Sequence, residues 1–134
     1  MDFGFPAAKR LKRGWQFDLV FRTGRRETGA LVRLSFLTDR GNSALAGVTV
    51  GKKIARAVKR TRGRRVMREA LRRLLPWVKD GVWIVASLRE NALDAKADDI
   101  YEDVAKSLKR RGLLTKEWKN RGWTVDSKDG GKCV

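Results

Sequence analysis

The pattern of hydrophobic and polar residues predicts a half-buried β-strand over residues 30–37. Apolar and polar side chains alternate there with the period of two that places successive side chains on opposite faces of a sheet. Arg33 and Ser35 are therefore expected to point away from the core. The residues expected on the core face are Val32, Leu34 and Phe36.

Two further apolar stretches are predicted to be strands. Residues 44–50 follow a turn signal at Gly41-Asn42, so this strand is expected to form a hairpin with the first. Residues 82–88 are apolar at almost every position, which is typical of a central strand covered on both faces. This apolar run is too short to cross a bilayer, because a membrane-spanning helix needs about 20 apolar residues.

A short first helix is predicted over residues 15–22, and Gly24 ends it. The helix is apolar on two sides, and Trp15 and Leu19 share one of them. Because these two residues are available for the core, the opposite side can contact a ligand. The residues on that opposite side are Phe17, Val20 and Phe21.

A last helix is predicted over about residues 98–111, with an aspartate as its N-terminal cap. Its apolar stripe consists of Tyr101, Val104, Ala105 and Leu108. With these elements the chain fits one domain, over residues 14–114. Residues 1–13 are expected to be a flexible basic arm, and residues 115–134 a disordered polar tail.

The longest predicted helix extends from Arg56 to Leu75, where Pro76 stops it. One face of this helix is apolar, and the opposite face carries arginines at spacings of three, three and four residues, with no acid expected among them. The apolar face consists of Gly63, Val66, Met67, Ala70, Leu71 and Leu74. The arginine face consists of Arg62, Arg65, Arg68 and Arg72. Arginine suits phosphate because its planar guanidinium group can bridge two phosphate oxygens.

Positive charge is concentrated around this helix. The 134 residues include 32 Lys and Arg but only 15 Asp and Glu, a formal net charge of +17. Residues 51–75 alone carry eleven basic side chains and one acidic side chain, Glu69. A binding surface concentrates charge in this way, whereas charge that serves only solubility is spread over the chain. Nucleic acid is therefore the expected partner, and a membrane surface is disfavoured because large apolar residues do not flank the charges.

Several kinds of chemistry are excluded by composition. The chain contains no histidine and a single cysteine, Cys133, so intramolecular disulfides, histidine metal sites and histidine-dependent triads are ruled out. Five acidic residues lie between positions 94 and 103, but their positions suit a helix cap and a solvated face better than a metal-dependent nuclease site. The N-terminal residues do not have the pattern of a signal peptide, so a cytoplasmic location is expected.

Phe17 and Phe21 allow two interpretations. They are four residues apart, so both rings lie on one side of the first helix. They could pack in the core. They could instead form a stacking platform for single-stranded nucleic acid, where each stacked base contributes about 1–3 kcal/mol.

The segment from Gly51 to Ala70 closely resembles the signature of the bacterial ribonuclease P protein component. The family signature is roughly S-K-K-x-G-x-A-V-x-R-N-R-x-K-R-x-x-R-E, and residues 9–110 match the family's segments in the same order. The chain departs from the signature at Gly51, which replaces serine, and at Ala55, which replaces glycine. It also departs at Thr61, where an asparagine with both donor and acceptor groups is usual.

The resemblance implies a single-domain α+β sandwich with the element order αβββαβα. It also implies an unusual left-handed β-α-β crossover, as in the second domain of a small-subunit ribosomal protein, although such crossovers are right-handed in nearly all folds. The implied order contains one short strand that the hydrophobic pattern does not reveal.

The resemblance further implies a subunit of ribonuclease P, which removes the 5′ leader from precursor tRNA. In this family a large RNA is the catalyst and uses Mg²⁺, so neither a catalytic residue nor a firmly bound cofactor is expected in the protein. The implied partners are the catalytic ribonuclease P RNA, in a 1:1 complex, and precursor tRNA. A structural RNA-binding protein of the ribosomal kind and a DNA-binding regulator remain alternatives, although an arginine-only face lacks the Asn or Gln that reads adenine.

The family's contact residues can be assigned to this chain by position. Docking on the catalytic RNA is assigned to Lys52, Lys53, Arg56, Lys59, Arg60, Arg62, Arg65, Arg68 and Arg72. Contact with the leader, in a cleft between the first helix and the sheet, is assigned to Phe17, Phe21, Arg33 and Ser35.

Overall fold

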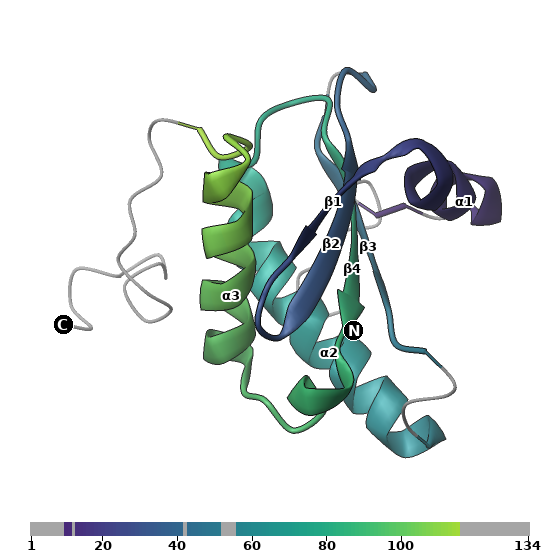
Figure 1. Ribbon diagram of the computed structural model, residues 1–134, viewed down its shortest axis with the longest axis vertical. Helices are drawn as coiled ribbons and strands as arrows, with labels where there is room; N and C mark the ends of the chain where they lie inside the picture. Colours follow the sequence, from purple (N-terminus) through teal and green to yellow (C-terminus); the bar gives the residue numbers. More distant parts are fainter. Residues whose placement is uncertain (1–9, 12, 42, 52–55, 116–134) are drawn as a thin grey trace, which may run out of the picture.

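A four-stranded mixed sheet forms the middle layer of an α+β sandwich in the computed structural model (Figure 1), which describes residues 10–11, 13–41, 43–51 and 56–115. The strands are β1 (Arg25–Thr28), β2 (Val32–Leu37), β3 (Leu45–Thr49) and β4 (Trp83–Leu88). The helices are α1 (Gly14–Thr23), α2 (Ala57–Leu74) and α3 (Ala97–Arg110), with short 3-10 turns at Leu75–Trp77 and Glu90–Ala92. The order αβββαβα is the one that the resemblance implies.

The strands are arranged in the order β1-β2-β4-β3. β2 pairs with β4 antiparallel, and β3 pairs with β4 parallel. The hairpin predicted between residues 30–37 and 44–50 is therefore wrong, because β4 lies between these two strands. The prediction that residues 82–88 form a central strand is confirmed. β3 and β4 are parallel neighbours connected through α2, so they form the β-α-β unit expected from the resemblance.

β1 is the strand that the hydrophobic pattern did not reveal. It is an edge strand, and its four residues are exposed or half-buried, so no apolar alternation marks it. The hairpin that does form is β1–β2. The side chain of Asp103 holds its turn, since the carboxylate accepts hydrogen bonds at 2.9–3.0 Å from the backbone N–H groups of Ala30, Leu31 and Val32. This contact joins α3 to the edge of the sheet.

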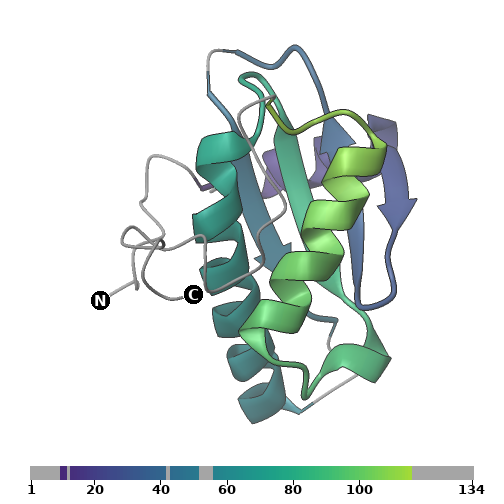
Figure 2. The same cartoon turned by 90° about the vertical axis from the view of Figure 1, so that its left-hand side faces the viewer.

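The larger core lies between the sheet and the two helices α2 and α3, which cover one face side by side (Figure 2). The predicted core face of β2 and the apolar stripe of α3 are buried there. Gly63 explains how closely α2 approaches the sheet. A Cβ at this position would lie 2.8 Å from Leu88 Cδ2, so any larger residue would require the Leu88 side chain to shift; the glycine avoids this at a cost of about 1 kcal/mol in a helix.

α1 covers part of the opposite face, where it packs on a smaller apolar cluster that includes Trp83 and Val85 (Figure 1). Val20 is fully buried at the centre of this contact, and Leu19 and Phe21 lie at its margins. Trp15 is 56% exposed, so the prediction that its side of the helix packs in the core is wrong for this residue. The helix buries one broad face rather than two, because only the sheet is available to cover it.

Two smaller corrections concern the chain ends. Residues 10 and 11, predicted to belong to a flexible arm, are attached to β3: Arg10 pairs with Ala46, and Leu11 is buried. α3 begins at Ala97 with Lys96 before it, so its aspartates lie in the first turn and not at the cap. The predicted disorder of residues 116–134 lies outside the described residues. In the described part of the chain, no helix has the length and apolar character needed to span a membrane.

Candidate nucleic-acid interface

The arginine face predicted on α2 exists, and its members differ in their partners. Arg72 forms a two-point ion pair with Glu69, with N–O distances of 2.5 Å and 3.2 Å. The hydrogen bond to this carboxylate raises the pKa of Arg72 above its usual value. The expectation that no acid relieves this face is therefore wrong at Arg72. A guanidinium that already has a carboxylate partner gains less from a phosphate.

Arg62 and Lys59 are tied to the segment that precedes α3. The Nη1 and Nη2 atoms of Arg62 donate hydrogen bonds to the backbone oxygens of Leu93 and Ala95, at 2.7 Å and 3.1 Å. Lys59 Nζ lies 3.4 Å from a carboxylate oxygen of Asp94. Both residues therefore hold this segment against α2, which is a structural role in addition to any contact with RNA.

Arg68 belongs to a group of three guanidinium groups, which we name the arginine cluster: Arg10, Arg64 and Arg68. Partial burial and the positive charges of Arg10 and Arg64 lower the pKa of Arg68. Within the residues that the structure describes, neither Arg64 nor Arg68 is paired with a carboxylate. Positive groups held together in this way repel one another, and an anion between them removes the repulsion. The arginine cluster can therefore bind a phosphate group.

The hydrophobic pattern did not indicate that Arg10 and Arg64 belong to this site. Arg64 lies beside the predicted arginine stripe, and Arg10 is 54 positions earlier in the chain. Arg10 comes close only because the residue after it, Leu11, is buried and donates a backbone hydrogen bond of 2.9 Å to Ala46. An apolar residue within a basic segment is the signal that could have indicated this attachment.

The remaining predicted docking residues in the described part of the chain lie in the first half of α2 or directly before it. Arg56 directly precedes the helix and is exposed, Arg65 is exposed on its outer face, and Arg60 is half-buried. Lys52 and Lys53 lie outside the described residues. The docking residues thus extend over a surface of α2 whose two sides differ. On one side Arg62 donates hydrogen bonds to backbone carbonyl groups of the protein itself, and the other side carries the arginine cluster.

The face of the sheet that carries α1 contains the predicted leader-contact residues. Paired residues of neighbouring strands project to the same face, so the register places side chains in rows. One row, which we name the polar strip, consists of Thr28, Arg33, Ser87 and Thr49. The next row consists of Arg26, Ser35, Val85 and Gly47. α1 packs over the apolar residues of this face, and the side chains of the polar strip are exposed or half-buried.

Phe17 is positioned at the boundary between α1 and these rows. A Cβ at Gly47 would lie 2.5 Å from Phe17 Cζ, so the ring rests directly on the backbone of β3. Phe17 and Phe21 are both half-buried against the smaller apolar cluster. Ser35 is buried at 6% exposure, whereas Arg33 is exposed. The structure therefore brings all four predicted residues to one face, with the rings contributing to packing as well.

An exposed aromatic contact at the start of α1 was not predicted. The ring centroids of Trp15 and Trp83 are 6.0 Å apart, and the guanidinium carbon of Arg40 lies 5.1 Å from the Trp83 centroid. Trp15 thus presents an exposed ring that packs on Trp83, and Trp83 in turn contacts the guanidinium group of Arg40. As for metals, no group of three or more acidic, cysteine or histidine side chains in the described regions could hold an ion.

Comparison with known proteins assigns the chain to one family. The family model described as Ribonuclease P matches residues 5–112. The chain is 34% identical over 111 residues to the ribonuclease P protein component of Symbiobacterium thermophilum, which covers 82% of this chain and 96% of that protein. It is 33% identical over 109 residues to the corresponding protein of Chloroflexus aggregans, covering 81% of each chain.

Solved structures agree in fold. The RNase P protein of Staphylococcus aureus superposes with a TM-score of 0.69 at 19% identity, covering 80% of this chain and 98% of that one. The RNase P protein of Thermotoga maritima superposes with a TM-score of 0.67 at 24% identity, covering 75% and 96%. At such identities the likeness concerns the fold, which is the α+β sandwich described above.

Proposed function

The chain belongs to the ribonuclease P protein component family, whose members are subunits of an RNA-processing enzyme. We propose that two surfaces of the protein bind two different RNAs in that enzyme. The basic surface of α2 binds the catalytic ribonuclease P RNA in a 1:1 complex. The polar strip and Phe17 bind the 5′ leader of precursor tRNA. The RNA performs the Mg²⁺-dependent cleavage, and the protein supplies binding and positioning.

The arginine cluster is the observation that carries the docking proposal. Its guanidinium groups come from two segments of the chain, and burial together with like charge already lowers the pKa of Arg68. A phosphodiester placed among them would accept several charge-assisted hydrogen bonds, which are about twice as strong as neutral ones. Each phosphate that such a cation neutralises also releases a counterion from the RNA, which is favourable at low salt.

The polar strip supports the assignment of the leader. An exposed arginine, two threonines and a serine in one row across the sheet offer hydrogen bonds to phosphate and sugar without demanding a base sequence. Phe17 lies next to these rows and can contribute an aromatic edge to a neighbouring base. This arrangement suits a single strand of variable sequence, which is what a leader is.

A reconstitution experiment tests the function. Precursor tRNA is incubated at low Mg²⁺ with the chain alone, with the catalytic RNA of the same organism alone, and with both. We expect cleavage at low Mg²⁺ only with both, because the protein's cations reduce the repulsion between two polyanions. If the chain changes neither the activity of the RNA nor its affinity for precursor tRNA, the proposal is wrong. A protein that binds ribosomal RNA equally well and ignores the leader would instead be a general RNA-binding protein.

Two substitutions four residues apart on α2 test the docking surface. Arg68→Ala removes a member of the arginine cluster, whereas Arg72→Ala removes an arginine already paired with Glu69. Arg68→Ala should reduce the dependence of log affinity on log salt by about one phosphate contact, a slope change of roughly 0.9. Arg72→Ala, the matched control, should change it less. Equal changes for both variants would contradict the importance of the cluster.

A further inference from the structure

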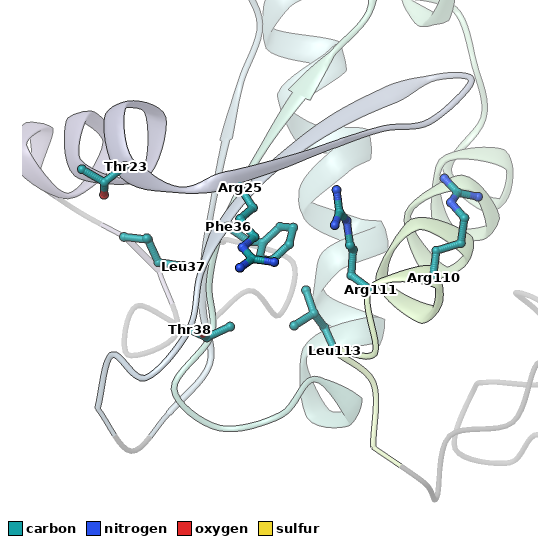
Figure 3. Close-up of a pocket in the computed structure, with 8 residues that line it drawn as sticks. All are labelled: Thr23, Arg25, Phe36, Leu37, Thr38, Arg110, Arg111 and Leu113. Carbon is teal, nitrogen blue, oxygen red and sulfur yellow. The ribbon is translucent and has the colours of Figure 1, made fainter.

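A cavity at the β1 edge of the sheet contains a second group of arginines that the docking surface on α2 does not use. Its volume is about 500 Å³, which is large enough for a nucleotide. Figure 3 shows its lining, which includes Arg25 from β1, Phe36 from β2, and Arg110 and Arg111 from the end of α3. Thr23 and Thr38 add hydroxyl groups.

Two of these arginines are held in place by one acid. Glu27 accepts hydrogen bonds from the Nε atoms of Arg110 and Arg111, at 2.7 Å and 2.8 Å. The bond from Arg110 is the main reason why the pKa of Glu27 lies below its ordinary value, so the carboxylate stays charged and keeps both side chains fixed. Fixed donors bind an anion with a smaller loss of side-chain entropy than mobile ones.

Donors remain after this pairing. The Nη2 atoms of Arg110 and Arg111 donate to Ser107 Oγ and to the backbone oxygen of Arg26. In the described part of the chain, their Nη1 groups have no hydrogen-bond partner. The guanidinium of Arg111 also lies 5.8 Å from the centroid of the buried Phe36 ring. The ring excludes water from one side of the cation, which strengthens its attraction for an anion.

Arg25 is the feature that a purely structural interpretation does not explain. The ion pairs with Glu27 attach the end of α3 to β1, and this attachment accounts for Arg110 and Arg111. Arg25 takes no part in it: it is exposed and, among the residues that the structure describes, has neither an acidic partner nor a hydrogen bond from its side chain. Arg25, Phe36 and Arg111 line the same cavity, and in Figure 3 the side chain of Arg25 overlaps the Phe36 ring in the view while that of Arg111 lies beside it. Three arginines and one glutamate leave two uncompensated positive charges at one cavity.

We propose that this cavity binds one phosphate group of an RNA strand, with Arg25 and Arg111 as its principal donors. The site is separate from the α2 docking surface. Arg10 of the arginine cluster is attached to β3, at the other edge of the sheet, and three strand spacings of about 4.8 Å put roughly 14 Å between these edges. RNA contacts at both edges would hold the protein in a defined orientation. The proposal rests on the proposed function, because an RNA-processing complex supplies the RNA.

Arg25→Ala is the decisive variant, since Arg111→Ala would also break the contact with Glu27. We expect this variant to weaken binding to either the catalytic RNA or precursor tRNA by about three- to tenfold. The slope of log affinity against log salt for that RNA should fall by about one phosphate contact. Arg25→Lys should keep the slope and recover part of the affinity, because lysine retains the charge but loses the planar donor pair. Lys106→Ala, which removes an exposed charge on α3 away from the cavity, is the matched control. Thermal unfolding of each variant verifies that the fold is intact.

Three affinities identify the source of the phosphate: that of the chain for the catalytic RNA, and those of the holoenzyme for precursor tRNA with and without its leader. A loss in the first assigns the phosphate to the catalytic RNA, and a loss in either of the others assigns it to the substrate. Unchanged affinities for Arg25→Ala, or an equal loss for Lys106→Ala, would overturn the proposal. Wild-type protein that fails to activate the RNA would instead defeat the proposed function, so the two failures are distinguishable.

Discussion

The two faces of the sheet are made by the same strands but have different compositions and different covers. On the face covered by α2 and α3, Leu34 and Ile84 are at most 1% exposed, because the two helices bury the apolar core of the sheet. On the other face one helix covers the apolar residues, and a row of polar side chains that includes Arg33 and Ser87 stays accessible. A strand with alternating residues can therefore contribute to folding with one face and to binding with the other.

The sharpest test of this comparison uses neighbouring residues of β2. Leu34→Ala should destabilise the protein by about 2–5 kcal/mol, because a fully buried leucine leaves a cavity in a core that cannot collapse to fill it. Arg33→Ala should change stability by no more than about 0.5 kcal/mol, because its side chain is exposed. Urea denaturation gives both values.

The same pair should behave in the opposite way in binding. Arg33→Ala should weaken the affinity of the reconstituted enzyme for leader-bearing precursor tRNA and leave that for leaderless tRNA unchanged. Comparable destabilisation by both substitutions would show that the two faces do not divide folding and binding as described.

The attachment of α3 to the β1–β2 turn gives the next largest expected effect. Asp103→Asn keeps the size of the side chain but replaces one carboxylate oxygen with an amide nitrogen. This nitrogen cannot accept a hydrogen bond, so at least one backbone N–H group that donates to Asp103 in the wild type loses its partner. We expect a loss of about 1–3 kcal/mol in the free energy of unfolding. Glu102→Gln, on the neighbouring exposed position of α3, should have almost no effect. Amide exchange at residues 30–32 should quicken only in the Asp103 variant.

Phe17 tests the boundary between packing and binding. Phe17→Leu retains an apolar side chain against Gly47 but removes the aromatic ring. If a leader base stacks on the ring, the Michaelis constant for leader-bearing substrate should rise severalfold, as expected for the lower end of the roughly 1–3 kcal/mol that a stacked base contributes. Affinity for the catalytic RNA should stay the same. A variant that is destabilised without any change in the Michaelis constant would restrict Phe17 to packing.

The smallest expected effect is a dependence of thermal stability on pH that comes from Glu27. The hydrogen bond from Arg110 lowers the pKa of Glu27 in the folded protein, so its contribution to stability is complete above the ordinary carboxyl pKa of 4.5 and is lost as pH falls through the lower folded value. The difference in Tm between the wild type and Glu27→Gln should therefore be largest near neutral pH and should shrink below pH 4.5. The difference is small because the pair is screened by solvent. A difference that does not change with pH would indicate that the ion pairs add no stability.

The parts of the fold that were predicted correctly are those that local periodicity encodes. The strand at 82–88, the apolar stripe of α3 and the two faces of α2 all depend on residues within a few positions of one another. β1 was missed in the hydrophobic pattern because an exposed edge strand needs no apolar side. The wrong hairpin has a related cause: the apolar pattern identifies strands but does not say which strands are neighbours.

The candidate site was predicted less completely than the fold. The spacing of the arginines on α2 was correct, but the contact of Arg62 with Leu93 and Ala95 depends on a segment about 30 residues later. The grouping of Arg64 and Arg68 with Arg10 depends on a segment more than 50 residues earlier. A helical wheel contains neither of these neighbours, so it cannot separate a structural arginine from one available for phosphate.

The sequence by itself determined that the chain has a strongly basic helix with an apolar back, that its strands have one face for the core, and that its motif is that of the ribonuclease P protein component. Charge and periodicity are local properties, so they can be read without a structure. Only the tertiary structure decided which positive charges are neutralised within the protein and which are crowded together. Those partners come from distant segments, and their positions follow from how the helices and strands pack.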